Sequence, residues 1–168
     1  MKKILLLSDT HGYIDERIVN HSKWADEVWH AGDIGDSKVT DTIAALKPLR
    51  AVYGNIDGSV LRSQFSENQF FNCEGINVWM THIGGYPGRY PAKIRTVIES
   101  KRPQLFICGH SHILKVISDK KYNLLHMNPG AAGKHGFHKV CTMLRFEVHE
   151  GIINSLEVIE YDRHEYQK

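Results

Sequence analysis

The chain has 168 residues, of which 21 are Lys or Arg and 19 are Asp or Glu, so its formal net charge is +2. This length is enough to bury a core as one domain, and we expect a single domain over residues 1–168. The near-zero charge argues against nucleic acid or an anionic membrane as a general partner, and no apolar run is long enough to cross a bilayer.

Short apolar runs that end at turn residues predict buried strands through the first two thirds of the chain. In chain order they are 4–7, 27–31, 49–53, 77–81 and 105–108. Apolar residues at helical spacing predict helices over 14–24, 37–46 and 89–100. Because strands and helices alternate, the pattern favours a mainly parallel sheet in an α/β fold.

The pattern changes after residue 112. Four further strands are predicted over 113–118, 122–127, 140–148 and 152–159, and short turns join them as in an antiparallel meander. The simplest architecture that accommodates these elements is a two-sheet β-sandwich flanked by helices. The polar segment 162–168 is expected to fray.

Each of the first five predicted strands is followed by residues of the kinds that bind metals. In chain order these are Asp9, His11, Asp33, Asn55, His82, His110 and His112. Loops at the carboxyl ends of parallel strands converge on one crevice, so residues far apart in sequence can meet there. Mixed imidazole and carboxylate ligands suit Mn, Fe, Zn, Co or Ni better than Ca or Mg alone. Seven ligands suit two ions that share a carboxylate, an arrangement used for phosphoryl transfer.

Taken singly, these residues also have ordinary structural explanations. Asp33 follows a glycine as many loop residues do, Asn55 is of a type common in turns, and His82 could be a hydrogen-bonded core imidazole. The sequence Gly109-His110-Ser111-His112 is the most informative, because two histidines two residues apart can straddle a pair of ions. The occurrence of all five elements in this order favours a metal site over chance.

The chain resembles the calcineurin-like metallophosphoesterase superfamily in five blocks, which are Asp9-x-His11, Gly32-Asp33, Gly54-Asn55-x-Asp57, Thr81-His82 and Gly109-His110-Ser111-His112. Its short length and the sequence Asn128-Pro129-Gly130 resemble the compact bacterial and archaeal phosphodiesterase branch of that superfamily. The resemblance spans most of the chain and implies the family's α/β/β/α fold.

The resemblance also implies roles for these residues. Asp9, His11 and His112 would bind a first metal ion, and Asn55, His82 and His110 would bind a second. Asp33 would bridge the two ions, and Asp33, Asn55 and His82 are the candidate catalytic residues. The implied enzyme is a metal-dependent phosphoric ester hydrolase that attacks a small phosphodiester with a metal-bridging hydroxide. Mn is the favoured metal, with Fe, Zn, Ni and Co as alternatives.

Two positions depart from the family pattern. Ile56 stands where the family has a histidine that assists the leaving group, so a contribution of ~10²–10⁴-fold in rate has no evident donor there. We therefore expect a bias toward good leaving groups such as aryl esters. Ile83 follows His82 where the family more often has glycine, and the shifted Gly84-Gly85 is expected to keep the turn.

A few further residues are candidates for substrate contact or for structural roles. Asn55, Asp57 and Arg89 are candidate substrate contacts, although a solvated loop position is the favoured alternative for Arg89. The segment 128–133 is expected to turn back over the crevice. Lys134, His135 and His138 follow it and could line the pocket, although exposure on the surface is the favoured interpretation. His30, inside a strand, is expected to be a hydrogen-bonded core residue.

Two other functions remain open at this stage. A protein-interaction scaffold like the retromer subunit of this fold would have an eroded metal site, and here all seven candidate ligands are present. A nuclease is disfavoured by the near-neutral charge. The cysteines Cys73, Cys108 and Cys141 are odd in number and widely spaced, which favours reduced thiols and a cytoplasmic location. A homo-oligomer is left open.

Overall fold

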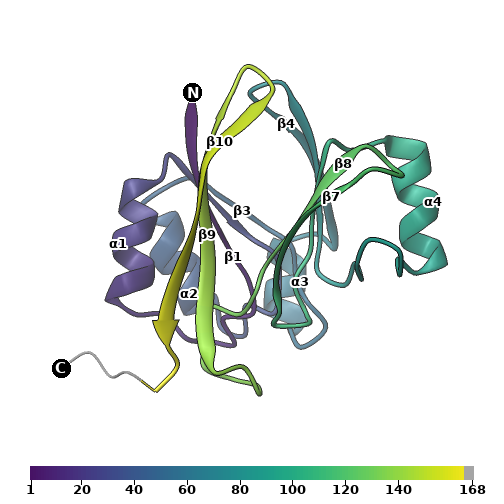
Figure 1. The fold of residues 1–168 in the computed structure, drawn as a ribbon. Helices are drawn as coiled ribbons and strands as arrows, with labels where there is room; N and C mark the ends of the chain where they lie inside the picture. The colour runs from purple at the N-terminus through teal and green to yellow at the C-terminus, as the bar shows by residue number, and fades with distance from the viewer. Residues whose placement is uncertain (165–168) are drawn as a thin grey trace.

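The computed structural model of the chain describes residues 1–164, which form two five-stranded sheets and their flanking helices (Figure 1). The first sheet contains β1 (Lys2–Leu7), β2 (Glu27–His30), β3 (Leu49–Ala51), β9 (Val140–His149) and β10 (Ile152–Asp162). The second contains β4 (Asn68–Cys73), β5 (Ile76–Thr81), β6 (Leu105–Ile107), β7 (Leu114–Asp119) and β8 (Leu124–Pro129). The helices are α1 (Glu16–Trp24), α2 (Ser37–Ala44), α3 (Ser59–Gln64) and α4 (Ala92–Lys101).

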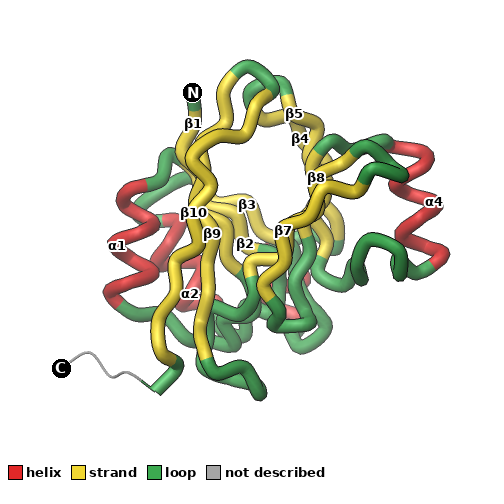
Figure 2. Tube along the Cα trace, in the orientation of Figure 1, coloured by secondary structure: helices red, strands yellow, loops and turns green. Residues whose placement is uncertain are grey.

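The two sheets pack face to face, and helices cover their outer faces (Figure 2). Successive side chains of β1 point to opposite faces, so Ile4 and Leu6 join the core between the sheets while Leu5 and Leu7 join the core under α1 and α2. Both faces are buried, which explains the unbroken apolar run. A third cluster, which includes Ile94 and Ile98, lies between α4 and the second sheet. The expected sandwich flanked by helices is confirmed.

Strand order places the carboxyl ends of three parallel strands from each sheet at one end of the sandwich. The first sheet has the order β10-β9-β1-β2-β3, in which β1, β2 and β3 run parallel. The second has the order β4-β5-β6-β8-β7, in which β5, β6 and β8 run parallel. The loops that follow β1, β2, β3, β5 and β6 carry the seven candidate ligands.

The predicted antiparallel meander after residue 112 is wrong. The strands β7 and β8 form an antiparallel hairpin at the edge of the second sheet, whereas β9 and β10 form another at the edge of the first. The segment 130–139 carries the chain from one sheet to the other, and the left-handed backbone at Gly130 (φ 73°) makes this turn possible. The alternation of apolar and polar residues along a strand cannot show which sheet a hairpin joins.

The sequence also failed to predict β4 and α3. The strand β4 contains Asn68, Gln69 and Asn72 and is only partly buried, so it lacks an apolar run. The helix α3 has six residues and no side-chain cap. Among the described residues, no helix is long and apolar enough to span a membrane. The expected fraying of 162–168 falls mostly outside the described residues, and β10 ends at Asp162.

Candidate metal centre

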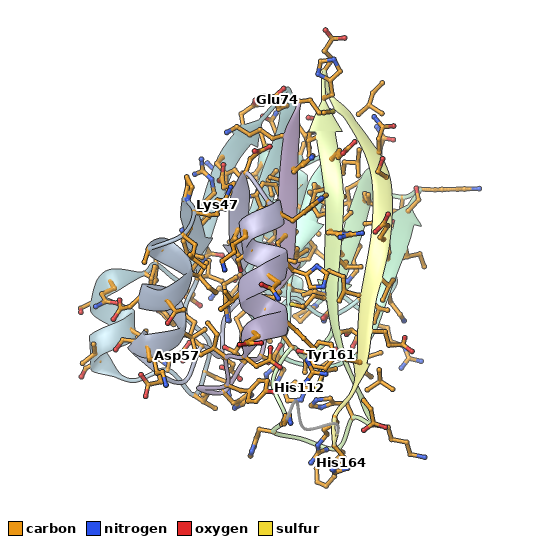
Figure 3. All side chains as sticks on the ribbon, turned by 90° about the vertical axis from the view of Figure 1, so that its left-hand side faces the viewer. Lys47, Asp57, Glu74, His112, Tyr161 and His164 are labelled. Atoms are coloured by element: carbon orange, nitrogen blue, oxygen red, sulfur yellow. The ribbon has the colours of Figure 1, made fainter. Side chains whose placement is uncertain are left out.

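The structure gathers the candidate ligands between the carboxyl ends of the two sheets. Figure 3 shows Asp57 and His112 near one end of the sandwich, far from Glu74 at the other. Six of the seven predicted residues form two groups of three, and within each group the ligand atoms lie within 4.8 Å of one another. The groups are Asp9, His11 and His112, and Asp33, His82 and His110. The seventh, Asn55, is exposed and lines the same pocket as His11, Asp33, His110 and His112.

The first group is organised by Asp9. Its Oδ2 accepts hydrogen bonds from the hydroxyl of Ser8 (2.6 Å) and the N–H of His110 (3.1 Å). This fixes the carboxylate so that Oδ1 faces Nε2 of His112 at 3.2 Å and Nε2 of His11 at 4.0 Å. Three ligand atoms of this kind around one point can hold a divalent ion.

The second group shares a carboxylate with the first. Oδ2 of Asp33 lies 3.2 Å from Nε2 of His82 and 3.6 Å from Nε2 of His11, so it faces a member of each group. The other oxygen, Oδ1, accepts the N–H of Ile56 at 3.1 Å. Nδ1 of His82 lies 2.8 Å from the carbonyl oxygen of Ala31, to which it can donate, and this leaves Nε2 directed at the site.

Three buried ligand atoms lack a hydrogen-bond partner among the described residues, and they are Asp9 Oδ1, His11 Nε2 and His82 Nε2. A buried polar atom without a partner costs about 1–3 kcal/mol, so its retention calls for an explanation. All three atoms face the space between the two groups. The donor set and these unsatisfied atoms together fit a pair of divalent ions.

The backbone of the ligand loops is strained. Five non-glycine candidate ligands have positive φ angles between 45° and 71°, and they are Asp9, His11, Asp33, His110 and His112. Such conformations cost about 1 kcal/mol or more each and cluster at functional sites. The loops turn sharply enough to direct several side chains from one loop toward the same point.

The charges of the two groups depend on one another. Burial would raise the pKa of Asp33, but the adjacent imidazole of His82 and the N–H of Ile56 hold it below its usual value. Burial lowers the pKa of His82, but Asp33 and Asp9 outweigh this effect and raise it. Burial lowers the pKa of His11. The carboxylate of Asp33 and the imidazole of His82 thus shift each other's pKa in opposite directions.

The structure places Asp57 in the support of the loops. Its buried carboxylate accepts the backbone N–H groups of Gly54 (2.7 Å), Gly35 (2.8 Å) and Ile34 (3.1 Å), which ties the loop after β3 to the loop after β2. These three hydrogen bonds occupy both carboxylate oxygens of Asp57, so neither oxygen is left to contact a substrate. Asp57 therefore positions Asp33 and Asn55 and does not line the pocket.

Two further residues brace the ligand loops from behind. His30 is fully buried, as expected, and its ring nitrogens are within hydrogen-bond distance of the Thr10 hydroxyl (2.9 Å) and the Gly32 N–H (3.2 Å). The side-chain amide of Asn128 donates to the carbonyl of Gly109 (2.9 Å) and the hydroxyl of Ser111 (3.1 Å). The segment after β8 thus supports the loop that carries His110 and His112.

A pocket of about 570 Å³ opens above the two ligand groups. Its lining includes His135 and His138, for which the surface was favoured over a place in the pocket. Their rings lie 4.7 Å from His11 and 5.2 Å from His112, respectively. The surface expectation is wrong for His138, which is partly buried, whereas His135 is exposed within the pocket. The cross-over of the chain between the sheets brings this segment to the site, and local sequence carries no signal for that. Arg89 is exposed and is not among the described residues that line the pocket.

A two-sheet sandwich with ligand-bearing loops at one end is the arrangement that the resemblance to metallophosphoesterases implies. The sequence model of the calcineurin-like phosphoesterase superfamily domain matches residues 1–151, and the chain belongs to this family. The resemblance inferred from the five motif blocks is thus confirmed. None of the curated proteins compared with the chain matches it significantly.

Solved structures share the fold at low sequence identity. A Thermotoga maritima protein is 22% identical, with a TM-score of 0.73 over 96% of this chain and 100% of that one. A Streptococcus pneumoniae protein described as a predicted phosphoesterase is 20% identical, with a TM-score of 0.70 over 96% and 90%. Entamoeba histolytica Vps29 complexed with Zn²⁺ is 14% identical, with a TM-score of 0.73 over 96% and 99%. At these identities the likeness concerns the fold.

Proposed function

We propose that the chain is a dinuclear metal-dependent phosphodiesterase that acts as one domain over residues 1–168. The observation that carries this proposal is the pair of adjoining ligand groups, with Oδ2 of Asp33 facing His11 of one group and His82 of the other. Asp33 is suited to bridge two ions. Mn is the favoured metal, and Fe, Zn, Ni or Co would suit the same ligands.

Two such ions, when bound, supply a water of lowered pKa as nucleophile and neutralise charge on the phosphate. The protein holds the ligands in place before any ion arrives, because Asp9 and Asp33 each have one oxygen fixed by backbone N–H donors. Asn55 is exposed at the mouth of the pocket, where its amide can contact both an ion and a phosphate oxygen. Preorganised ligands avoid reorganisation during the reaction.

The residue next to Asn55 supports a diester with a good leaving group. The Ile56 side chain is 47% exposed and lines the pocket, so the position at which the family resemblance implies an acid carries an apolar group instead. An aryl oxide departs without that help, whereas a simple alkoxide needs it. We therefore propose small aryl-type phosphodiesters as the substrate class.

The experiment that tests this function combines metal analysis with hydrolysis of bis-p-nitrophenyl phosphate and p-nitrophenyl phosphate, with and without Mn²⁺. We expect about two ions per chain, Mn²⁺-dependent turnover and a preference for the diester. Asp33→Asn should lower turnover by ~10²-fold or more and reduce metal content, because it weakens the shared ligand. Asp41→Asn, at an exposed position of α2, is the matched control and should change neither quantity.

Absence of bound metal together with absence of Mn²⁺-dependent turnover would exclude the enzyme and favour the scaffold alternative. The solved Vps29 structures show only that proteins of that name share the fold. For a nuclease, the chain has a net charge of only +2, which gives no electrostatic support for binding to DNA. The buried free thiols Cys73, Cys108 and Cys141 support a reducing, cytoplasmic setting. Sedimentation would decide between a monomer and a homo-oligomer.

A further inference from the structure

Three large apolar side chains surround the candidate metal centre and remain exposed to solvent. Ile56 is 47% exposed, Ile113 is 57% exposed and Phe137 is fully exposed, and all three line the pocket above the ligand groups. We call these three residues the apolar rim. Two of them adjoin candidate ligands in sequence, since Ile56 follows Asn55 and Ile113 follows His112. Leaving such side chains in water forgoes the stabilisation that burial of their hydrocarbon would give.

Phe137 is held at the rim by an anchored segment. The ring nitrogen Nε2 of His138 lies 2.8 Å from the carbonyl oxygen of Gly133, and the guanidinium of Arg163 donates to the carbonyl oxygens of Gly136 and of His138, the latter at 3.0 Å. The backbone on both sides of Phe137 is therefore tied to the body of the protein. The side chain is displayed beside the pocket without packing against the fold.

The position of the rim indicates what it contacts. Apart from the rim, the lining is mainly polar and consists of imidazoles, the carboxylate of Asp33, the amide of Asn55 and the hydroxyl of Ser111, whereas the rim supplies only hydrocarbon. A phosphodiester matches both the polar lining and the apolar rim, because its phosphate is anionic and its ester groups can be apolar. A volume of about 570 Å³ is in the range of pockets that hold small organic ligands.

We propose that the apolar rim is a specificity subsite that binds an aromatic ester group of the substrate while the phosphate lies on the metal ions. The proposal rests on the proposed function, because the phosphate must be held at the ligand groups. It adds that affinity for the ester group comes from burial of hydrocarbon against Ile56, Ile113 and Phe137. An aromatic ring also makes the good leaving group that the lack of an acid at position 56 requires.

The test measures binding of non-hydrolysable probes to the full-length, Mn²⁺-loaded protein by calorimetry. The probes are inorganic phosphate, methylphosphonate and phenylphosphonate, which share the anion and differ in the attached group. We expect phenylphosphonate to bind about tenfold more tightly than methylphosphonate, because the ring buries apolar surface at the rim. Phe137→Ser and Ile113→Ser should each reduce this ratio by threefold or more and leave methylphosphonate affinity unchanged within twofold.

Ile152→Ser is the matched control. Ile152 is 58% exposed, close to the 57% of Ile113, but it lies in β10 and does not line the pocket. This variant should keep the full preference for phenylphosphonate. If Ile152→Ser reduced the preference for phenylphosphonate as much as Ile113→Ser does, the effect would come from general surface hydrophobicity and the proposed subsite would be wrong.

The remaining outcomes separate the subsite from the function on which it rests. Equal binding of methylphosphonate and phenylphosphonate, with phosphate still bound, would overturn the subsite and leave the phosphodiesterase proposal standing. Failure of all three anions to bind would overturn both. A concentration-dependent dimer that Phe137→Ser abolishes, together with equal binding of the two phosphonates, would assign the rim to a contact between copies of the chain.

Discussion

Ile56 lies between two residues with different roles. Asn55 lines the pocket, whereas Asp57 is buried and holds the ligand loops together. Its backbone N–H donates to Asp33, so the main chain at this position serves the ligand groups whatever the side chain is. Its side chain is free to vary without disturbing that bond. This separation makes position 56 suitable for testing the missing acid.

Ile56→His should restore an acid near the leaving group. We expect the hydrolysis rate of dimethyl phosphate, whose alkoxide is a poor leaving group, to rise about tenfold or more, and that of methyl p-nitrophenyl phosphate to rise less than threefold. Steady-state kinetics in Mn²⁺ would measure both. Ile56→Gln is the control, because it adds polarity without a group that titrates near neutral pH. If Ile56→His raised both rates equally, the explanation based on a missing acid would be wrong.

The candidate ligands could be predicted at the residue level because each lies directly after a strand. The motif around His110 and His112 is local, and the parallel order of the strands brings such loops together. The roles of Asp57, His135 and Phe137 could not be predicted in this way. Asp57 belongs to a family motif, yet its bonds to Ile34 and Gly35 come from a distant loop. His135 and Phe137 reach the pocket only through the crossing between the sheets.

At the scale of elements, the ligand loops are packed so closely that one position admits no side chain. A Cβ atom on Gly54 would lie 2.8 Å from Cγ of Asp33 and closer still to its Oδ1 and its backbone nitrogen. The loop after β3 and the loop after β2 therefore approach within the width of a methyl group. The carboxylate of Asp57 holds them there by bonding to both.

Gly54→Ala should displace Asp33 and weaken metal binding. We expect the affinity for Mn²⁺ to fall at least tenfold and the free energy of unfolding to fall by about 1–3 kcal/mol, as in other overpacked sites. Calorimetric titration and urea unfolding would measure the two quantities. Gly58→Ala is the matched control four residues later, because a Cβ atom there would meet no atom of residues 1–164 within 4 Å. Equal metal affinity in the two variants would contradict the role given to the close approach.

The elements that the sequence failed to predict share a physical cause. The strand β4 is only partly buried, so its stability comes from pairing with β5 rather than from an apolar run. The two C-terminal hairpins were predicted as strands, but their assignment to different sheets depends on packing across the whole fold. Local patterns specify strands, whereas tertiary contacts decide their partners.

At the scale of the whole molecule, the two sheets contribute to the centre in comparable measure. Asp9, His11, Asp33 and Asn55 follow strands of the first sheet, whereas His82, His110 and His112 follow strands of the second. The geometry of the centre therefore depends on how the sheets pack. Carboxylate oxygens of the first sheet face imidazoles of the second, as in the 3.2 Å approaches of Asp9 to His112 and Asp33 to His82.

Two buried histidines, His30 and His126, make the stability of the whole fold depend on pH. Burial lowers the pKa of each from 6.5 to about 4. Between these values the unfolded chain binds protons that the folded protein excludes, so stability is complete above pH 6.5 and is lost as the pH falls toward 4. Each histidine accounts for at most roughly 3 kcal/mol of this loss.

His126→Leu should remove the contribution of one histidine to this pH-dependent loss of stability. The variant loses the hydrogen bond between the ring and Tyr90 (3.2 Å), which lowers stability by about 1 kcal/mol independently of pH. Between pH 6.5 and 4.5 its free energy of unfolding should then fall less steeply than that of the unmodified protein. Urea unfolding in EDTA measures this slope without the pH dependence of metal binding. Tyr90→Phe, which removes the same hydrogen bond but keeps the buried imidazole, should retain the original slope, and an unchanged slope in His126→Leu would contradict the role of that imidazole.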